Sequence, residues 1–297
     1  MDTFAKKLEE TMASLVSAEV FCGHGYESVH DEAVALVLGA AALPPGQTES
    51  LLVEGFPEAI EPRLQQIVSA RCVERMPVAY VLGEAWLAGL RFKADRRALV
   101  PRSPIAHVLA EGCEPWLVDG LEPRTILDLC CGGGSLGIIA AHAFPASKVV
   151  LSDLDAQALT LAQENIALHG LEGRVSVAQA DLVASLADGS IDLLVANPPY
   201  VSADEMTELP AEYAHEPRWA LEAPEEGTAL AVEVMRGAAR VLSERGLLIF
   251  EVGETFRVLE QHLPRVPFTW IDLPEGGAGV AVASAQELRD WSATGIL

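Results

Sequence analysis

The stretch Ile191-Asp-Leu-Leu-Val-Ala-Asn197-Pro-Pro-Tyr200 combines a short, almost wholly apolar run with an abrupt stop. Residues 191–196 have the composition of a strand that is buried on both faces of a sheet. Two prolines end this strand, because neither can donate a backbone N–H to a neighbouring strand and each fixes its own φ. In open α/β sheets, ligands bind beside the carboxyl ends of strands. The stretch therefore predicts a ligand site at residues 197–200.

The chemical groups of this turn suit a planar NH2 group. The side-chain oxygen of Asn197 and the proline carbonyls are acceptors for its two hydrogens, and the Tyr200 ring is a surface for its π face. The tetrapeptide alone is equally compatible with a structural turn that contains a buried tyrosine. The rest of the chain has to decide between the two interpretations.

Length, composition and charge limit the possible classes of protein. The 297 residues suffice for one or two domains. No apolar run approaches the roughly 18 residues that span a bilayer, and the five cysteines follow no disulfide or metal-binding spacing. We expect a cytoplasmic protein with no membrane segment and no metal site. The net charge of −23, without a basic patch, disfavours direct nucleic-acid recognition. It would attract a basic partner, although acidity that serves solubility explains it equally well.

Residues 1–84 predict a small helical domain for substrate recognition. Asp31 is the expected N-cap of its second helix. His24 and His30 lie near loop glycines, so we expect them to have capping or surface roles. The expected helices cover residues 4–20, 31–42 and 57–75.

Residues 85–105 are predicted to form a β-hairpin linker, and residues 106–297 alternate strands with helices. Such alternation is typical of a doubly wound, mostly parallel sheet. A hairpin around the glycine-rich residues 274–279 makes one strand antiparallel, and Glu251 is expected to end a strand without a chemical role. The seven expected strands cover residues 125–129, 148–152, 175–178, 191–196, 246–251, 269–273 and 280–283.

The segment Asp128-Leu-Cys-Cys-Gly-Gly-Gly-Ser-Leu-Gly137 contains a G-x-G-x-x-G pattern between a strand and a helix. Asp153 ends the next strand, close to the roughly 20-residue spacing of an acid that binds ribose hydroxyls. A nicotinamide or flavin enzyme fits this pattern, as does an enzyme that uses S-adenosylmethionine. Asp128 favours S-adenosylmethionine, because a carboxylate there repels a pyrophosphate and attracts the ammonium of a methionine moiety.

A third acid, Asp181, follows the third strand of this region. Its carboxylate is placed to accept from an adenine amino group while Leu182 packs on the ring, although Asp181 alone would also suit a helix cap. Three acids after three successive strands predict S-adenosylmethionine as the cofactor. The candidate cofactor-binding residues are Asp128, Cys130, Gly132, Gly134, Asp153, Asp181, Leu182 and Asn197.

The Asp128 loop together with residues 197–200 resembles the methyltransferases that act on planar NH2 nitrogens. Further segments resemble the protein-(glutamine-N5) methyltransferase family, and within it the branch that acts on large-subunit ribosomal protein L three. The resemblance implies a Rossmann-like class I methyltransferase fold, with a mostly parallel seven-stranded sheet and a small N-terminal helical domain. The segments that carry it are residues 23–25, 31–34, 77–80, 100–105, 209–217 and 267–270.

This resemblance implies N5-methylation of a glutamine side chain in that basic ribosomal protein. It assigns catalytic roles to Asn197, Pro198 and Tyr200, and substrate contacts to these three and Pro199. A related branch acts on peptide release factors and usually has Pro-Arg-Pro-Glu-Thr where this chain has Pro-Arg-Ser-Pro-Ile at residues 101–105. Release-factor methylation, adenine-N6 methylation of nucleic acid and a non-catalytic binding module remain the alternatives.

Two residues depart from the pattern of this family. Cys131 and Gly133 stand where the family more often has threonine and serine. A hydroxyl contact to the cofactor is therefore expected to be missing. The acids and the other glycines of the loop keep the expected residue types, so we expect activity to be retained.

Overall fold

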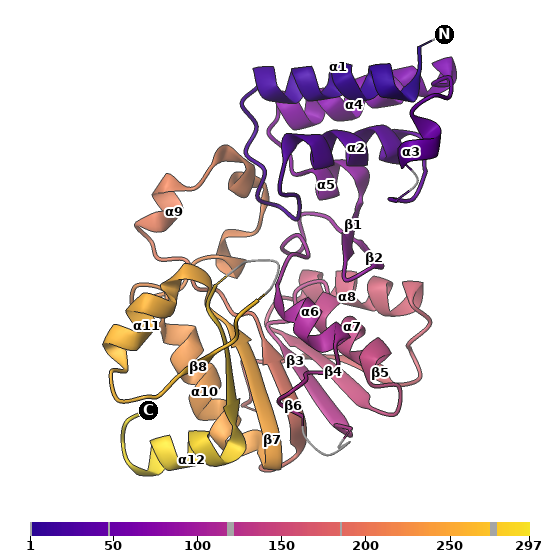
Figure 1. The fold of residues 1–297 in the computed structure, drawn as a ribbon. Helices are drawn as coiled ribbons and strands as arrows, with labels where there is room; N and C mark the ends of the chain where they lie inside the picture. The colour runs from indigo at the N-terminus through magenta and orange to yellow at the C-terminus, as the bar shows by residue number, and fades with distance from the viewer. Residues whose placement is uncertain (1, 47, 118–121, 185, 274–277) are drawn as a thin grey trace.

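The computed structural model describes residues 2–46, 48–117, 122–184, 186–273 and 278–297 (Figure 1). At the N-terminus, a bundle of helices packs around a core that includes Leu15, Leu36 and Phe56. Figure 1 shows this bundle, coloured indigo to purple, at one end of the molecule, with the sheet below it. The bundle contains α1 (Phe4–Ser17), α2 (Val29–Ala40), α3 (Thr48–Leu51), α4 (Glu61–Cys72) and α5 (Val78–Leu82).

Two expectations for the bundle are wrong. The N-cap of α2 is Ser28, whose hydroxyl accepts from the Asp31 N–H; Asp31 lies in the first turn, where a negative charge favours the helix dipole. His24 is not a surface residue but is 2% exposed, because its ring packs against Tyr213, which is far away in the sequence.

A two-stranded hairpin follows the bundle, with β1 (Glu84–Leu87) paired antiparallel to β2 (Leu90–Lys93). Asn165 on α8 (Ala156–Leu168) joins this hairpin to the rest of the molecule. Its side chain accepts from the Lys93 N–H (2.7 Å) and donates to the Lys93 carbonyl (3.2 Å) and the Gly133 carbonyl (2.9 Å). One buried amide therefore links the hairpin, a helix and the glycine-rich loop.

The central sheet has seven strands in the order β5-β4-β3-β6-β7-β9-β8. Strands β3 to β7 are parallel to one another, and β9 is antiparallel to both β7 and β8. The predicted sheet of seven strands, mostly parallel, is confirmed. The strands are β3 (Thr125–Leu129), β4 (Lys148–Asp153), β5 (Val175–Gln179), β6 (Ile191–Ala196), β7 (Leu242–Glu251), β8 (Thr269–Trp270) and β9 (Val280–Ser284).

Helices cover both faces of the sheet, so side chains alternate along the strands between two apolar cores. Ile126 belongs to the core beneath α6, α7 and α8, whereas Leu127 belongs to the core beneath α10, α11 and α12. Continuous apolar runs such as residues 191–196 result from this burial on both faces. The covering helices not yet bounded are α6 (Ile105–Ala110), α7 (Ser135–Ala143), α10 (Ala229–Val241), α11 (Phe256–His262) and α12 (Ala285–Ala293).

Some boundaries differ from the expected ones. Strand β7 begins at Leu242 instead of residue 246 and is bulged opposite Ile191 and Leu193. The predicted closing hairpin is confirmed in its strands, although residues 274–277 of its connection lie outside the described residues. Among the helices in the described ranges, none is long and apolar enough to cross a membrane.

The Asn165 side chain predicts a testable contribution to stability. Asn165 is fully buried, and Asn165→Ala leaves the buried Gly133 carbonyl and the partly buried Lys93 backbone groups without their partner. We expect the free energy of unfolding in urea to fall by about 2–4 kcal/mol, since each buried unpaired group costs roughly 1–3 kcal/mol. Gln163→Ala, at an exposed position on the same helix, should change it by less than about 0.5 kcal/mol. Equal values for the two variants would contradict this role.

Candidate active site

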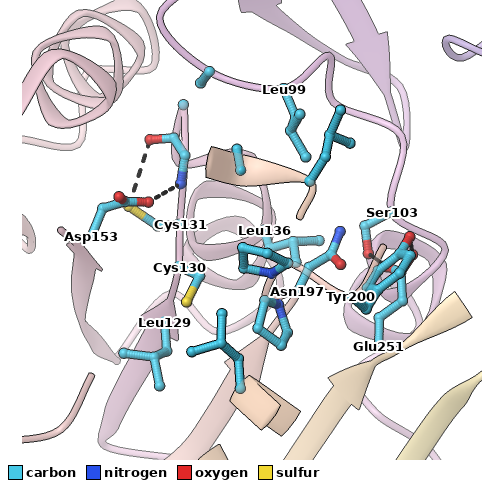
Figure 2. A pocket seen from close by; sticks show the side chains of 18 of the residues that line it. Leu99, Ser103, Leu129, Cys130, Cys131, Leu136, Asp153, Asn197, Tyr200 and Glu251 are labelled. Carbon is cyan, nitrogen blue, oxygen red and sulfur yellow. Dashed lines mark hydrogen bonds between the residues drawn. The ribbon is translucent and has the colours of Figure 1, made fainter. Parts of the chain in front are cut away.

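A cavity of about 300 Å³ opens at the carboxyl ends of β3, β4 and β6. It brings together all but one of the residues that the sequence singled out, and Figure 2 shows Asn197 between Asp153 with the two cysteines on one side and Tyr200 with Glu251 on the other. The exception is Gly134, which does not line the cavity. The predicted residues in the wall are Asp128, Cys130, Gly132, Asp153, Asp181, Leu182, Asn197, Pro198, Pro199 and Tyr200.

The loop between β3 and α7 turns through residues with positive φ. Gly132 has φ +52° and Gly134 has φ +81°. A Cβ on Gly134 would lie 2.6 Å from Leu151 Cδ1, so this glycine allows α7 to approach the sheet closely. Cys130 also has a positive φ, +57°, although it is not a glycine. The loop therefore exposes its backbone to the cavity in a conformation that ordinary side chains disfavour.

Asp128 is buried in β3, and its Oδ2 accepts from the Gly137 N–H at 2.7 Å, near the start of α7. The pKa of Asp128 is raised from 3.8 to about 7, because burial and, to a smaller extent, the charge of Asp153 raise it more than this hydrogen bond lowers it. The carboxyl group thus fixes α7 against β3, and Asp128 is one of the residues that line the cavity.

Asp153 ends β4 and holds the glycine-rich loop from the other side. Its Oδ2 accepts from the Gly132 N–H at 2.8 Å (Figure 2), and its Oδ1 accepts from the Asp155 N–H at 2.9 Å. Burial raises the pKa of Asp153, and both hydrogen bonds oppose that rise. After β5, Asp181 is exposed, and Leu182 lines the cavity with φ +46°.

The carboxamide of Asn197 makes no hydrogen bond to any group in the described ranges, and the Pro198 carbonyl accepts none there. Both residues line the cavity directly after β6. Their hydrogen-bonding capacity is therefore available to a ligand. An amide oxygen and a backbone carbonyl are acceptors, so this place suits a donor such as an NH2 group.

Tyr200 is held at several points along its backbone and side chain. Its carbonyl accepts from the Thr255 hydroxyl at 2.8 Å, and a Cβ on Gly227 would lie 2.1 Å from that carbonyl. A Cβ on Gly253 would lie 2.8 Å from the ring. The phenol donates to Glu251 Oε1 at 3.0 Å. The ring thus has a fixed position beside the free groups of residues 197 and 198.

Glu251 is a cavity residue that the sequence expectation missed. It ends β7, the strand next to β6, and its Oε2 accepts from the Ser103 hydroxyl at 2.5 Å (Figure 2). Burial raises its pKa, and the hydrogen bonds from Ser103 and Tyr200 lower it. The signal in the sequence was an acid at the end of a strand. That this strand lies next to β6, and that Glu251 therefore contacts Tyr200, follows only from the strand order of the sheet.

The predicted linker also contributes to the wall. Residues 98–103 line the cavity, and Arg102 binds both carboxylate oxygens of Glu216 at 2.6 and 2.8 Å. Burial raises the pKa of Glu216, but Arg102 and His24 outweigh it and hold the pKa at about 2. These contacts give Glu216 a structural role in the cavity wall.

The order of the strands in the sheet sets the order of the polar groups along the cavity. The adjacent strands β5, β4, β3 and β6 end in or lead into Asp181, Asp153, Asp128 and Asn197, respectively. Neighbouring strands lie roughly 4.8 Å apart, so these groups form a row along the edge of the sheet. An elongated ligand with several polar groups fits such a row, with its last group at Asn197.

Comparison with known proteins gives consistent results over nearly the whole chain. Residues 114–266 match the family model described as Methyltransferase small domain. The ribosomal protein uL3 glutamine methyltransferase of Bordetella pertussis is 37% identical over 97% of this chain and 97% of its own length. The protein of the same name from Xanthomonas campestris is 43% identical over 91% and 87%, and that from Francisella tularensis is 35% identical over 97% and 92%.

The raised pKa of Asp128 predicts a pH dependence. The stability that its carboxyl group contributes is fully present below its ordinary pKa of 3.8 and is lost as the pH rises to about 7, because the folded state retains the proton longer than the unfolded state. Asp128→Asn removes this titration. The unfolding free energy of the wild type minus that of Asp128→Asn should therefore fall between pH 4 and pH 7 and then level off.

Urea unfolding at intervals of half a pH unit measures this difference. Asp204→Asn, at an exposed position outside the cavity wall, is the control and should follow the wild type. A difference between the wild type and Asp128→Asn that does not change with pH would show that burial of this carboxyl has no effect on its titration.

Proposed function

Because this chain belongs to the family of ribosomal protein uL3 glutamine methyltransferases, we propose that it transfers a methyl group from S-adenosylmethionine to the side-chain nitrogen of a glutamine in ribosomal protein uL3. The observation that carries this proposal is that the Asn197 carboxamide and the Pro198 carbonyl, on two adjacent cavity residues, have no hydrogen-bond partner among the described residues. These acceptors and the fixed Tyr200 ring match an amide NH2 group.

The row of polar groups supports S-adenosylmethionine as the methyl donor. Asp181 and Leu182 would hold the adenine, Asp153 the ribose hydroxyls, and Asp128 with the loop backbone the methionine part. The positive φ of Gly132 lets the backbone approach a ligand closely at this point. When bound, S-adenosylmethionine supplies a strongly electrophilic methyl group. No pyrophosphate site is required, and a row of carboxylates would repel one.

Alignment is the main task of the acceptor site, because an amide nitrogen is a weak nucleophile whose lone pair is delocalised into its carbonyl. The Asn197 oxygen and the Pro198 carbonyl would each accept one N–H of the glutamine side chain. Two such contacts fix the direction of the nitrogen and stabilise the positive charge that develops on it. Tyr200 would pack against the glutamine. The proton becomes acidic as the nitrogen is alkylated, so it can pass to these acceptors or to water.

The experiment that tests the function is a methyl-transfer assay. Purified uL3, a peptide release factor and DNA are offered separately with S-adenosylmethionine, and mass spectrometry locates the added methyl group. We expect one methyl group on a glutamine of uL3. Modification of the release factor alone would keep the chemistry but overturn the substrate, whereas modification of DNA alone would overturn both.

Asn197→Ala removes the acceptor and leaves the rest of the row intact. We expect the kcat for uL3 methylation to fall on the order of 100-fold, because the amide nitrogen loses its alignment. The Kd for S-adenosylmethionine, measured by calorimetry, should change by less than about threefold, within ~0.7 kcal/mol. A variant with near-normal turnover would contradict the proposed mechanism.

A further inference from the structure

The segment after the Asn197 turn lies between the sheet and the helical bundle. It contains α9 (Glu205–Glu208) and a 3₁₀ helix over Ala211–His215, and Figure 1 shows it reaching from the sheet toward the bundle. Leu209 and Tyr213 of this segment line the cavity. Part of the cavity wall is therefore built on contacts with the bundle, and the function proposed above assigns no role to those contacts.

Glu212 attaches this segment to the bundle. Its Oε1 accepts a hydrogen bond from the Phe21 N–H at 2.9 Å. The same oxygen lies 3.0 Å from Arg71 Nη1 and 2.9 Å from Arg75 Nη2. The side chains of Arg71 and Glu212 are almost fully buried. Burial raises the pKa of Glu212, but the Phe21 N–H and Arg71 hold it below its ordinary value. Phe21, Arg71 and Arg75, which contact this carboxylate, all belong to the bundle.

Glu216 attaches the other end of the segment. Besides binding Arg102, it accepts from the Val100 N–H at 2.8 Å, and its Oε2 lies 3.3 Å from Nε2 of the buried His24. The two carboxylates are four residues apart and contact different parts of the chain. Together they prevent the intervening residues from moving away from the cavity.

Tyr213 lies between these two attachments. Its ring packs against His24 at 4.4 Å between ring centroids and against Phe21 at 6.0 Å, while the Arg102 guanidinium carbon lies 5.7 Å from its centroid. Ser103, the residue after Arg102, donates to Glu251, and Glu251 also accepts from the Tyr200 phenol. Tyr213 and Tyr200 are thus linked through adjacent residues of the cavity wall, so Tyr213 lies on the Tyr200 side of the cavity.

We propose that Tyr213 is a substrate-positioning residue, whose ring contacts the protein segment beside the target glutamine, and that Glu212 lets the helical bundle set the place of this ring. The inference rests on the proposed function for the identity of the substrate. The target glutamine is part of a protein chain, so the residues on either side of it come close to the cavity wall. The half-buried ring of Tyr213 on that wall is placed to contact them. Asp153 lies on the other side of Asn197 from Tyr200 and Glu251 (Figure 2).

Steady-state kinetics of four variants test this proposal. Tyr213→Ala should raise the KM for uL3 about tenfold, as expected for loss of one aromatic contact, while the Kd for S-adenosylmethionine stays within about twofold. Tyr213→Phe should have a KM for uL3 close to that of the wild type, because it keeps the ring. Glu212→Gln should raise the same KM about two- to tenfold. This variant is expected to fold, because Arg71 keeps its pair of contacts with Glu32.

Lys7→Met is the matched control for damage to the bundle. Lys7 is partly buried in its own charge cluster with Glu10 and Glu61 and has no contact with the Glu212 segment in the described ranges. This variant should lower the melting temperature and leave the KM for uL3 unchanged. A similar KM increase in Lys7→Met and Glu212→Gln, or no increase in Tyr213→Ala, would overturn the proposal, as would failure of Tyr213→Phe to restore it.

Hydrogen exchange separates this proposal from the function on which it rests. The amides of residues 211–216 should exchange faster in Glu212→Gln than in the wild type or in Lys7→Met, with no substrate present. Unchanged exchange would overturn the role of Glu212. If the wild type methylates an offered protein other than uL3, the proposed substrate is wrong, and the same KM comparison with that protein decides the role of Tyr213.

Discussion

Parallel pairing of β3 with β4 on one side and β6 on the other is the constraint on which the cavity depends. Parallel strands bring all their carboxyl ends to one edge, so residues from positions 128, 153, 181 and 197 become neighbours although the chain between them forms helices. Burial on both faces keeps these strands straight and apolar up to the edge. The polar groups of the site consequently begin where the apolar strands end.

The acceptor side shows how this edge is made rigid. Residues 197–200 have no regular secondary structure, yet Tyr200 is held by hydrogen bonds with Thr255 and Glu251. Gly227 and Gly253 pack so closely against Tyr200 that a side chain at either position would clash with it. Because these contacts already hold the turn in place, its groups lose little conformational entropy when a substrate binds. Asn197 thus lies on a well-supported turn with no side-chain hydrogen bond to a described residue, which is the arrangement expected of a binding group.

Patterns along the sequence predicted the sheet, the glycine-rich loop and most of the cavity residues, because strand periodicity, prolines and loop glycines are local signals. They did not predict the burial of His24, the place of Glu251 in the cavity or the role of Arg102 in its wall. The contacts of these residues join positions 24 with 216, 103 with 251 and 102 with 216. Nothing local distinguishes such a buried charged residue from one on a solvated surface, so only the assembled fold reveals it.

Glu212 limits how the parts of this protein can be exchanged with those of relatives. Phe21 and Arg71 of the bundle donate to its Oε1 and Arg75 forms an ion pair with it, while its second oxygen is buried with no hydrogen-bond partner in the described structure. A chimera with a foreign bundle would leave a buried carboxylate without compensation, at a cost of several kcal/mol. The bundle and the segment at residues 209–217 therefore have to be transplanted, and to change in evolution, as one unit.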